Sequence, residues 1–308
     1  MSKIIYSNAK ELYEIYYNLY RPPPQSLELT SKNYFNHISK YTFVYHYNDD
    51  LQKVRIITEQ REPVNIEMNK YFDTYKMIEK FGYNKSGYSS LFSKNTKKLP
   101  PLIGIHCLCP VYFDNNSKSV GDIRVHVINS IGVALDTTKQ PDYKYFLNNN
   151  FIGIIERLAK SYNIVWKCAN QFKLNRVILC KLGGGYFCNN FPGNYLEDLF
   201  IPALIQSLNN NINNLPKIIG IMDTDNNTSE IIKKIVNEHG CDFECVGRIP
   251  DILYDENTLY QNAWDPHSMV GNGNSGDNSL DGFFGRYTGM HFLCWPPTNP
   301  NIKYIQLV

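Results

Sequence analysis

The residues best suited to chemistry lie in one glycine-rich segment near the end of the sequence, residues 261–286. Its carboxylates are Asp265, Asp277 and Asp281. Aspartates that converge in one site can divide acid and base roles, because their mutual repulsion raises the pKa of at least one of them. Apolar residues such as Trp264 and Phe284 interrupt the segment, which favours a packed loop over a disordered one.

Metal binding is the alternative for this segment and for the cysteines. A calcium loop of the D-x-[DN]-x-[DN]-G type needs an oxygen ligand where the sequence has Leu280, so the spacing does not fit. Cys107-x-Cys109 and Cys241-x3-Cys245 are not paired C-x-x-C motifs, and zinc would need a distant histidine as well. The cysteines are therefore expected to be buried, reduced thiols, as in a protein of a reducing compartment.

A second glycine-rich loop directly follows the strand-like run 175–182. Its residues are Gly183, Gly184, Gly185, Tyr186 and Phe187. Glycines let backbone N–H groups approach a phosphate, and the two aromatic rings could flank a sugar or base. The alternative is a turn that only needs a positive φ. Asp223, at the end of the run 217–222, could contact an adenine amino group or a ribose hydroxyl, although strand-end aspartates often cap helices.

These motifs together resemble the macrodomain family, whose members bind ADP-ribose. The segment from Asn262 to Asp265 resembles the family's N-A-A-N element. The segment that contains Gly271, Asn272 and Gly273, followed by Leu280, Asp281 and Gly282, resembles the family's phosphate loop. The family's other loop, G-x-G with a nearby aromatic residue and proline, resembles the segment from Gly183 to Phe187 with Pro192. A V-H-V run of the family matches residues 125–127. The similarity covers about residues 122–290.

The chain departs from the family pattern in three ways. The N-A-A-N-like element follows the G-x-G-like loop instead of preceding it, which implies a circularly permuted order. Its fourth position is Asp265 instead of asparagine, and residues 274–278 lengthen the phosphate loop. The loop is also similar to that of macrodomain-like hydrolases of bacterial effectors and viruses, some of which act on ADP-ribosylated arginine.

The resemblance implies an ADP-ribosyl hydrolase that needs neither metal nor cofactor and acts on ADP-ribose carried by a modified protein. By the same resemblance, Asp281 is expected to position the ligand or activate water. Asn262 and the glycine loops are expected to contact the ligand. Asp277 and Asp265 are further catalytic candidates that belong to this sequence alone. Three alternatives stay open: an ADP-ribose-binding or nucleotide-binding module without catalysis, a structural or host-interaction protein, and a metal-dependent phosphoester hydrolase.

The elements that must position these loops form an α/β pattern. Apolar runs at 102–113, 122–135, 175–182, 217–222 and 241–247 predict strands, and amphipathic runs at 151–172, 196–208 and 229–240 predict helices between them. The alternation predicts a mixed, largely parallel sheet with helices on both faces. Residues 1–100 are expected to form an α+β extension with a hairpin at 41–47 and 53–60, and residues 101–308 the macrodomain-like domain.

Composition supports a folded chain without an obvious polyanionic partner. Of 308 residues, 43% are hydrophobic and 14% aromatic, which is enough for a substantial core. The formal net charge is only +2, from 31 Lys and Arg against 29 Asp and Glu. Neither nucleic acid nor an anionic membrane is therefore expected as a partner. The apolar runs are strand-sized, so neither a transmembrane helix nor the apolar region of a signal peptide is expected. A cytoplasmic location is therefore expected.

Overall fold

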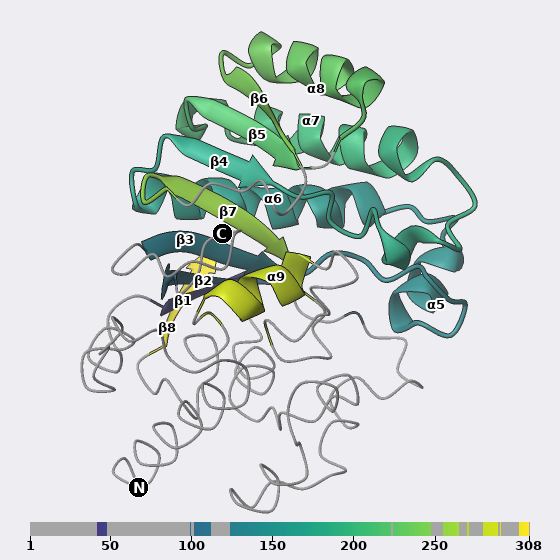
Figure 1. The fold of residues 1–308 in the computed structure, drawn as a ribbon. Helices are drawn as coiled ribbons and strands as arrows, with labels where there is room; N and C mark the ends of the chain where they lie inside the picture. Colours follow the sequence, from purple (N-terminus) through teal and green to yellow (C-terminus); the bar gives the residue numbers. More distant parts are fainter. Residues whose placement is uncertain are drawn as a thin grey trace, which may run out of the picture.

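The computed structural model describes residues 42–47, 99, 102–111, 124–222, 224–247, 255–264, 270, 280–288, 290 and 302–307. One eight-stranded sheet organises them, in the order β6-β5-β4-β7-β3-β2-β1-β8 (Figure 1). The strands are β1 (Thr42–Tyr47), β2 (Ile103–Pro110), β3 (Arg124–Ser130), β4 (Arg176–Leu179), β5 (Ile218–Met222), β6 (Asp242–Val246), β7 (Thr258–Ala263) and β8 (Lys303–Leu307).

The sheet is mixed but largely parallel, as the sequence predicts. Strands β3, β7, β4, β5 and β6 are parallel to one another. Strand β2 is antiparallel to both of its neighbours, β3 and β1, and β8 is parallel to β1. Strand β2 is thus the one described strand that runs against the others.

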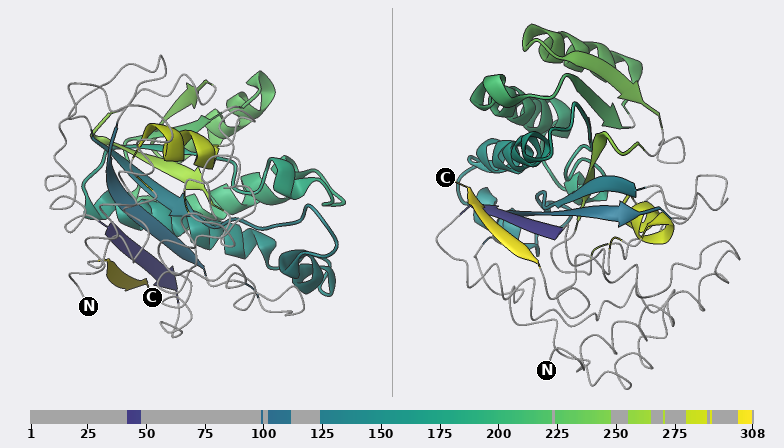
Figure 2. Two further views of the ribbon diagram at one scale, coloured as in Figure 1. Left: turned by 60° about the horizontal axis from the view of Figure 1, so that its bottom comes forward. Right: turned by 90° about the vertical axis from the view of Figure 1, so that its left-hand side faces the viewer.

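Helices lie on both faces of the sheet, which confirms the predicted α/β architecture (Figure 2, right). The helices are α5 (Pro141–Leu147), α6 (Ile154–Gln171), α7 (Ile201–Asn210), α8 (Asn226–Glu238) and α9 (Leu280–Tyr287), with a π-helical turn at Tyr195–Phe200 and 3-10 turns at Tyr186–Cys188 and Ile212–Asn214. Helix α6 lies behind the sheet in Figure 1, and α9 lies in front of it. Helix α5 and strands β7 and β8 were not predicted.

Close packing of α6 on the sheet depends on a glycine in β2. A Cβ atom at Gly104 would lie 2.6 Å from Cγ2 of Ile164 in α6. Ile164 and its neighbours Val165 and Trp166 are fully buried, and Nε1 of Trp166 donates to Oγ of Ser207 in α7 at 2.6 Å. The amphipathic pattern of α6 therefore reflects a helix held between the sheet and α7.

Within the described ranges, no helix is long and apolar enough to cross a membrane.

Strand β1 comes from the segment that the sequence assigned to an N-terminal extension, yet it belongs to the main sheet. It pairs with β2 on one side and with β8 on the other. Both neighbours of β1 thus differ from the hairpin partner predicted at residues 53–60, which lie outside the described residues. The remainder of the predicted α+β extension also lies almost entirely outside them and stays a prediction.

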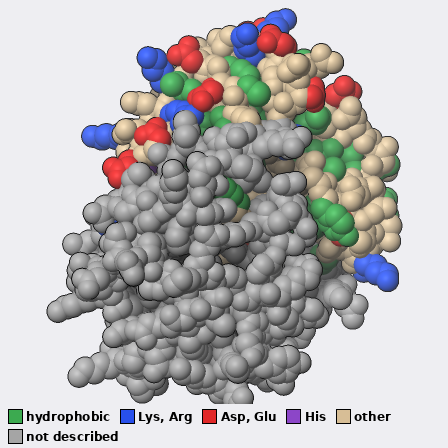
Figure 3. Space-filling view, viewed as in Figure 1, with side chains coloured by type: hydrophobic (Ala, Val, Ile, Leu, Met, Phe, Trp, Pro, Cys, Tyr) green, Lys and Arg blue, Asp and Glu red, His purple; other side chains and the backbone are tan. Residues whose placement is uncertain are grey.

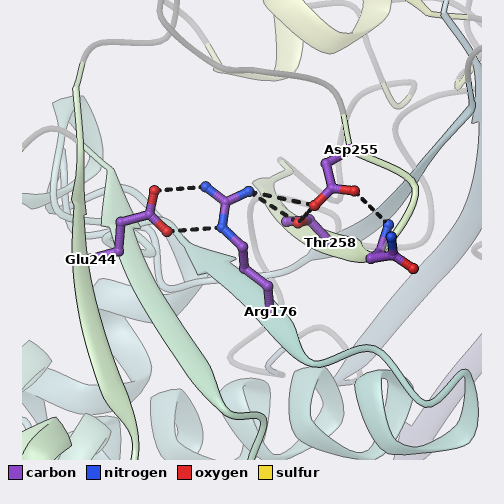
Figure 4. Close-up of polar contacts among 5 residues, drawn as sticks. Arg176, Glu244, Asp255 and Thr258 are labelled. Atoms are coloured by element: carbon purple, nitrogen blue, oxygen red, sulfur yellow. Dashed lines mark hydrogen bonds and ion pairs between the residues drawn. The ribbon is translucent and has the colours of Figure 1, made fainter.

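A charged cluster joins three strands at the edge of the sheet where β4 and β7 begin (Figure 4). The guanidinium of Arg176 donates two hydrogen bonds to Glu244 of β6, from Nε at 2.8 Å and from Nη2 at 2.7 Å. Its Nη1 donates to Oγ1 of Thr258 at 3.0 Å and lies 3.9 Å from Oδ2 of Asp255. Bidentate contacts of this kind fix both geometry and register. On the described part of the face shown in Figure 3, positively and negatively charged side chains are interspersed.

Candidate functional site

The two glycine-rich motifs of the sequence leave from neighbouring strands in the middle of the sheet. Strand β7 lies between β3 and β4 and is parallel to both. The carboxyl ends of the three strands therefore meet at one edge, which is where open α/β sheets bind ligands. The loop that begins at Gly183 follows β4, and Asn262 lies near the end of β7. The arrangement creates a candidate site at this edge.

Asn262 and Asp281, far apart in the predicted motif, are in direct contact. Nδ2 of Asn262 donates to Oδ1 of Asp281 at 2.8 Å and to Oδ1 of Asn129 at 2.7 Å. Asn262 and Asn129 are fully buried, and Asp281 is 7% exposed. Buried polar groups are costly without partners, so this network accounts for two asparagines inside adjacent central strands.

Helix α9 places the carboxylate of Asp281. The helix begins at Leu280, so Asp281 lies in its first turn, where the helix dipole favours a negative charge. Figure 1 shows α9 beside the carboxyl end of β7. The buried Phe283 and Phe284 hold the helix against the sheet, with the ring of Phe284 6.1 Å from that of Tyr260. The local sequence thus anchors the helix through its apolar residues and presents the aspartate at its start.

Sequence reasoning missed Asn129 and the polar side chains next to it. Asn129 and Ser130 end the buried strand β3, and Gln261 precedes Asn262 in β7. Oε1 of Gln261 accepts from the backbone N–H of Cys180 at 3.2 Å. The available signal was the placement of amides and a hydroxyl at the ends of otherwise apolar central strands, where each such group needs a partner.

Three buried polar atoms at this edge lack a hydrogen-bond partner within the described part of the chain. They are Oδ1 of Asn262, Nε2 of Gln261 and Oγ of Ser130. An unsatisfied buried polar group costs roughly 1–3 kcal/mol. The edge therefore carries unused hydrogen-bonding capacity, which a bound ligand or water can satisfy.

The first glycine of the loop after β4 is explained by the fold itself. Gly183 has a φ of +76°. A Cβ atom there would lie 2.8 Å from Oη of Tyr195 and 2.9 Å from the carbonyl oxygen of Val133. The N–H of the next residue, Gly184, is used inside the turn, where it donates to the carbonyl of Lys181 at 2.9 Å. For Gly183, the alternative of a turn with positive φ is therefore confirmed.

Gly185 and Tyr186 differ from the first two glycines, because they form the open part of the loop. A Cβ atom at Gly185 would meet no atom within 4 Å, and no described group accepts a hydrogen bond from its N–H. The side chain of Tyr186 is 70% exposed. Phe187 is half-buried, and its carbonyl accepts from the N–H of Leu135 at 2.7 Å, which ties the loop to the segment after β3.

Two buried tyrosines hold the base of this loop. Oη of Tyr162 donates to the carbonyl of Cys180 at 3.2 Å and accepts from the N–H of Leu182 at 3.3 Å. Oη of Tyr195 donates to the carbonyl of Leu182. Burial raises the pKa of Tyr162 and of Tyr195 well above the ordinary tyrosine value. Both hydroxyls therefore keep their protons and act as fixed donors under all ordinary conditions.

The segment after β3 is pinned by a buried carboxylate. Oδ2 of Asp142, at the start of α5, accepts from the N–H of Ala134 at 2.9 Å. Burial raises the pKa of Asp142, while the charge of Arg157 acts in the opposite direction. This contact fixes the path of residues 131–136 beside the glycine loop.

Several predicted site residues lie outside the described residues. They are Asp223, Asp265, Gly271, Asn272, Gly273 and Asp277. Asp225, which follows Asp223, caps α8: its Oδ1 accepts from the N–H of Thr228 at 2.9 Å. The hydrogen bonds from Thr228 lower the pKa of Asp225. Asp225 is therefore the N-cap of α8.

The described cysteines and histidines do not assemble into a zinc site. Sγ of Cys107 and Sγ of Cys109 lie 3.1 Å apart, both fully buried, and His106 between them points to the other face because side chains alternate along a strand. Within the described residues, no three His, Cys, Asp or Glu side chains gather where they could hold a metal ion. None of the seven described cysteines forms a disulfide.

A scan against models of protein families and a search of curated proteins both returned no match to this chain. The function proposed for the chain therefore depends on the contacts of its own residues.

Proposed function

We propose that this chain binds ADP-ribose at the edge formed by the carboxyl ends of β3, β7 and β4, and hydrolyses the bond between ADP-ribose and a modified protein. The observation that carries the proposal is the buried contact between Asn262 and Asp281, next to the strand that leads into the glycine loop at Gly183. It joins two motifs that the sequence separates, in the place where α/β sheets bind nucleotides.

The glycine loop suits the diphosphate of the ligand. The open N–H of Gly185 and the space beside it allow a phosphate oxygen to approach the backbone closely. Tyr186, exposed on the same loop, offers a ring for contact with a sugar or base. In this proposal, Gly183 and Gly184 determine the shape of the loop, and Gly185 contacts the ligand.

The Asn262–Asp281 pair suits the sugar and its chemistry. Oδ1 of Asn262 is a buried acceptor without a partner in the described part of the chain, and a ribose hydroxyl is a donor. Hydrolysis at an anomeric carbon passes through an oxocarbenium-like transition state. The carboxylate of Asp281 would activate water or stabilise the positive charge that develops there. Asp277 and Asp265 remain candidates for assisting the leaving group.

Binding without cleavage is the second candidate. The carboxylate of Asp281 is almost completely buried and already accepts from Nδ2 of Asn262. A carboxylate engaged in this way can position a ligand without acting as a base. A reader of ADP-ribosylated proteins would need nothing beyond Asn262 and the two loops.

The proposal is tested by isothermal titration with ADP-ribose, with AMP and ribose-5-phosphate as controls. Binding that requires the whole ligand supports the site, whereas no heat and no thermal shift at millimolar ADP-ribose would contradict it. Release of ADP-ribose from arginine-, serine- and carboxylate-linked proteins then separates hydrolysis from binding. Hydrolysis that persists with a chelator distinguishes this mechanism from a metal-dependent phosphoester hydrolase. The absence of disulfides among the described cysteines supports the proposed location in the reducing cytoplasm.

A further inference from the structure

A relay of amide and carboxylate groups crosses the sheet from β2 to α9. Nδ2 of Asn129 donates to the carbonyl oxygen of Ile105 at 3.0 Å. Nδ2 of Asn262 donates to Oδ1 of Asn129 at 2.7 Å and to Oδ1 of Asp281 at 2.8 Å. The relay therefore begins at a backbone group and ends at the carboxylate of the candidate site.

The chemistry of the two end groups fixes the direction of the relay. A backbone carbonyl only accepts, so Ile105 holds Nδ2 of Asn129 and turns Oδ1 of Asn129 toward Asn262. The carboxylate of Asp281, in its ionised form, also only accepts. Both groups therefore require Nδ2 of Asn262. A flipped carboxamide would place its oxygen against an oxygen at both contacts.

The orientation of Asn262 determines what the site presents to a ligand. With Nδ2 engaged twice, Oδ1 of Asn262 is the remaining atom, buried and without a partner among the described residues. An oxygen acceptor beside a carboxylate attracts a hydroxyl and disfavours a phosphate or carboxylate.

We infer that Asn129 is a positioning residue: it holds the carboxamide of Asn262 so that Oδ1 faces the ligand and selects a hydroxyl donor. The inference rests on the proposed function, because the hydroxyl would belong to the distal ribose of ADP-ribose. ADP lacks this second ribose. Asn129 itself contacts Asn262 and the backbone of β2, and acts on the ligand through Asn262.

A purely structural role for Asn129 predicts a different outcome. Removing a buried hydrogen bond inside the sheet would lower stability without changing which ligand is preferred. Ser207→Ala is the matched control, because Oγ of Ser207 accepts a buried hydrogen bond from Nε1 of Trp166 between α6 and α7. It removes a buried hydroxyl, which also donates to Oδ1 of Asn163 at 2.9 Å, away from β3 and β7.

The experiment is isothermal titration of the full chain with ADP-ribose and with ADP. In Asn129→Leu, the affinity for ADP-ribose is expected to fall about tenfold, as for the loss of one hydrogen bond, while that for ADP stays within about twofold. Ser207→Ala is expected to lower the melting temperature and keep the wild-type preference. An unchanged preference in Asn129→Leu would overturn the inference alone. Absence of ADP-ribose binding by the wild type would overturn the proposed function with it.

Asn129→Asp supplies a second test that does not depend on the folding of the leucine variant. A neutral carboxyl has the shape of the amide: its O–H can donate to Ile105 and its carbonyl can accept from Asn262. The ionised form lacks that donor. The preference of Asn129→Asp for ADP-ribose over ADP is therefore expected to return toward the wild-type value as pH falls. A preference that stays below the wild-type value at every pH tested would contradict the positioning role.

Discussion

Strands β4 and β7 carry a polar cluster at each end, and the two clusters differ in what they leave unsatisfied. Where the strands begin, Arg176, Glu244, Thr258 and Asp255 satisfy one another (Figure 4). Where they end, the cluster around Asn262 keeps an acceptor without a partner in the described part of the chain. The first arrangement is that of a structural clamp, and the second leaves capacity for a ligand.

The largest expected effect is on catalysis at the second cluster. In Asp281→Asn, turnover of an ADP-ribosylated protein is expected to fall at least about a hundredfold, because an amide cannot act as a general base. ADP-ribose binding should change much less, since an amide oxygen can still accept from Asn262. Rates and calorimetric affinities are measured side by side, with the exposed Asp242→Asn in β6 as control. Full turnover in Asp281→Asn would contradict the catalytic role of Asp281, whereas no turnover in the wild type would favour a site that only binds.

The clamp is expected to respond in the opposite way. Arg176→Met removes charged hydrogen bonds from a side chain that is 22% exposed, and should lower the free energy of unfolding by about 2 kcal/mol. Affinity for ADP-ribose should not change. Urea denaturation measures the first quantity and calorimetry the second. A large loss of affinity in a folded Arg176→Met protein would show that the two clusters are not independent.

The two ends of the glycine loop provide a matched pair of variants. Gly183→Ala forces a side chain into a φ of +76° against Tyr195 and Val133, and is expected to cost about 1–2 kcal/mol of stability. Gly185→Ala meets no atom within 4 Å, so its stability should remain near wild type while ADP-ribose affinity falls several-fold. Thermal unfolding and titration of both variants decide the assignment. Equal affinity in Gly185→Ala would remove this glycine from the ligand site.

A third buried polar pair, in β2 and β3, sharpens the comparison, because it also has an atom without a described partner. Nε2 of His106 and Nδ1 of His126 lie 2.9 Å apart beside the ring of Phe172. Nδ1 of His106 lacks a described partner. If Nε2 of His106 donates to His126, Nδ1 of His106 is a hydrogen-bond acceptor that remains unused among aromatic rings.

The smallest expected effect is the pH dependence of stability from this pair. Burial lowers the pKa of His126 from 6.5 to about 4 in the folded chain. Between these values the unfolded chain binds a proton that the folded chain does not, so the free energy of unfolding falls as pH drops below 6.5. One pH unit below 6.5, the loss from His126 alone should be about 1 kcal/mol. Urea midpoints at pH 7.5 and 5.5 measure it, and His126→Phe should reduce the difference.

The sequence predicted the sheet well because its strands are short apolar runs between amphipathic helices. It did not predict β7 (Thr258–Ala263), whose last residues it assigned to a glycine-rich loop, or β8 (Lys303–Leu307). It also predicted neither the neighbours of β1 nor helix α5. The alternation in residues 42–47 identifies a strand but not its partners, and β2 is more than fifty residues away. Helix α5 has seven residues, too few for a periodic pattern to stand out.

For the candidate site, the sequence led to Asn262 and Asp281 and missed Asn129. Glycine-rich loops are visible as local patterns, whereas Asn129 matters through a residue 133 positions away. An asparagine in a buried strand gives no indication of which strand lies next to it. The register that pairs Asn129 with Asn262 comes from the sheet order, and that order follows from the packing of the whole chain.

The location of the ligand is the central claim, and a crystal structure of the chain with ADP-ribose tests it most directly. The expected result is a ribose hydroxyl within hydrogen-bonding distance of Oδ1 of Asn262, with the diphosphate beside Gly185. ADP-ribose bound elsewhere, for example over the clamp at Arg176, would contradict the claim and leave the Asn129–Asn262–Asp281 relay as a feature of the fold alone.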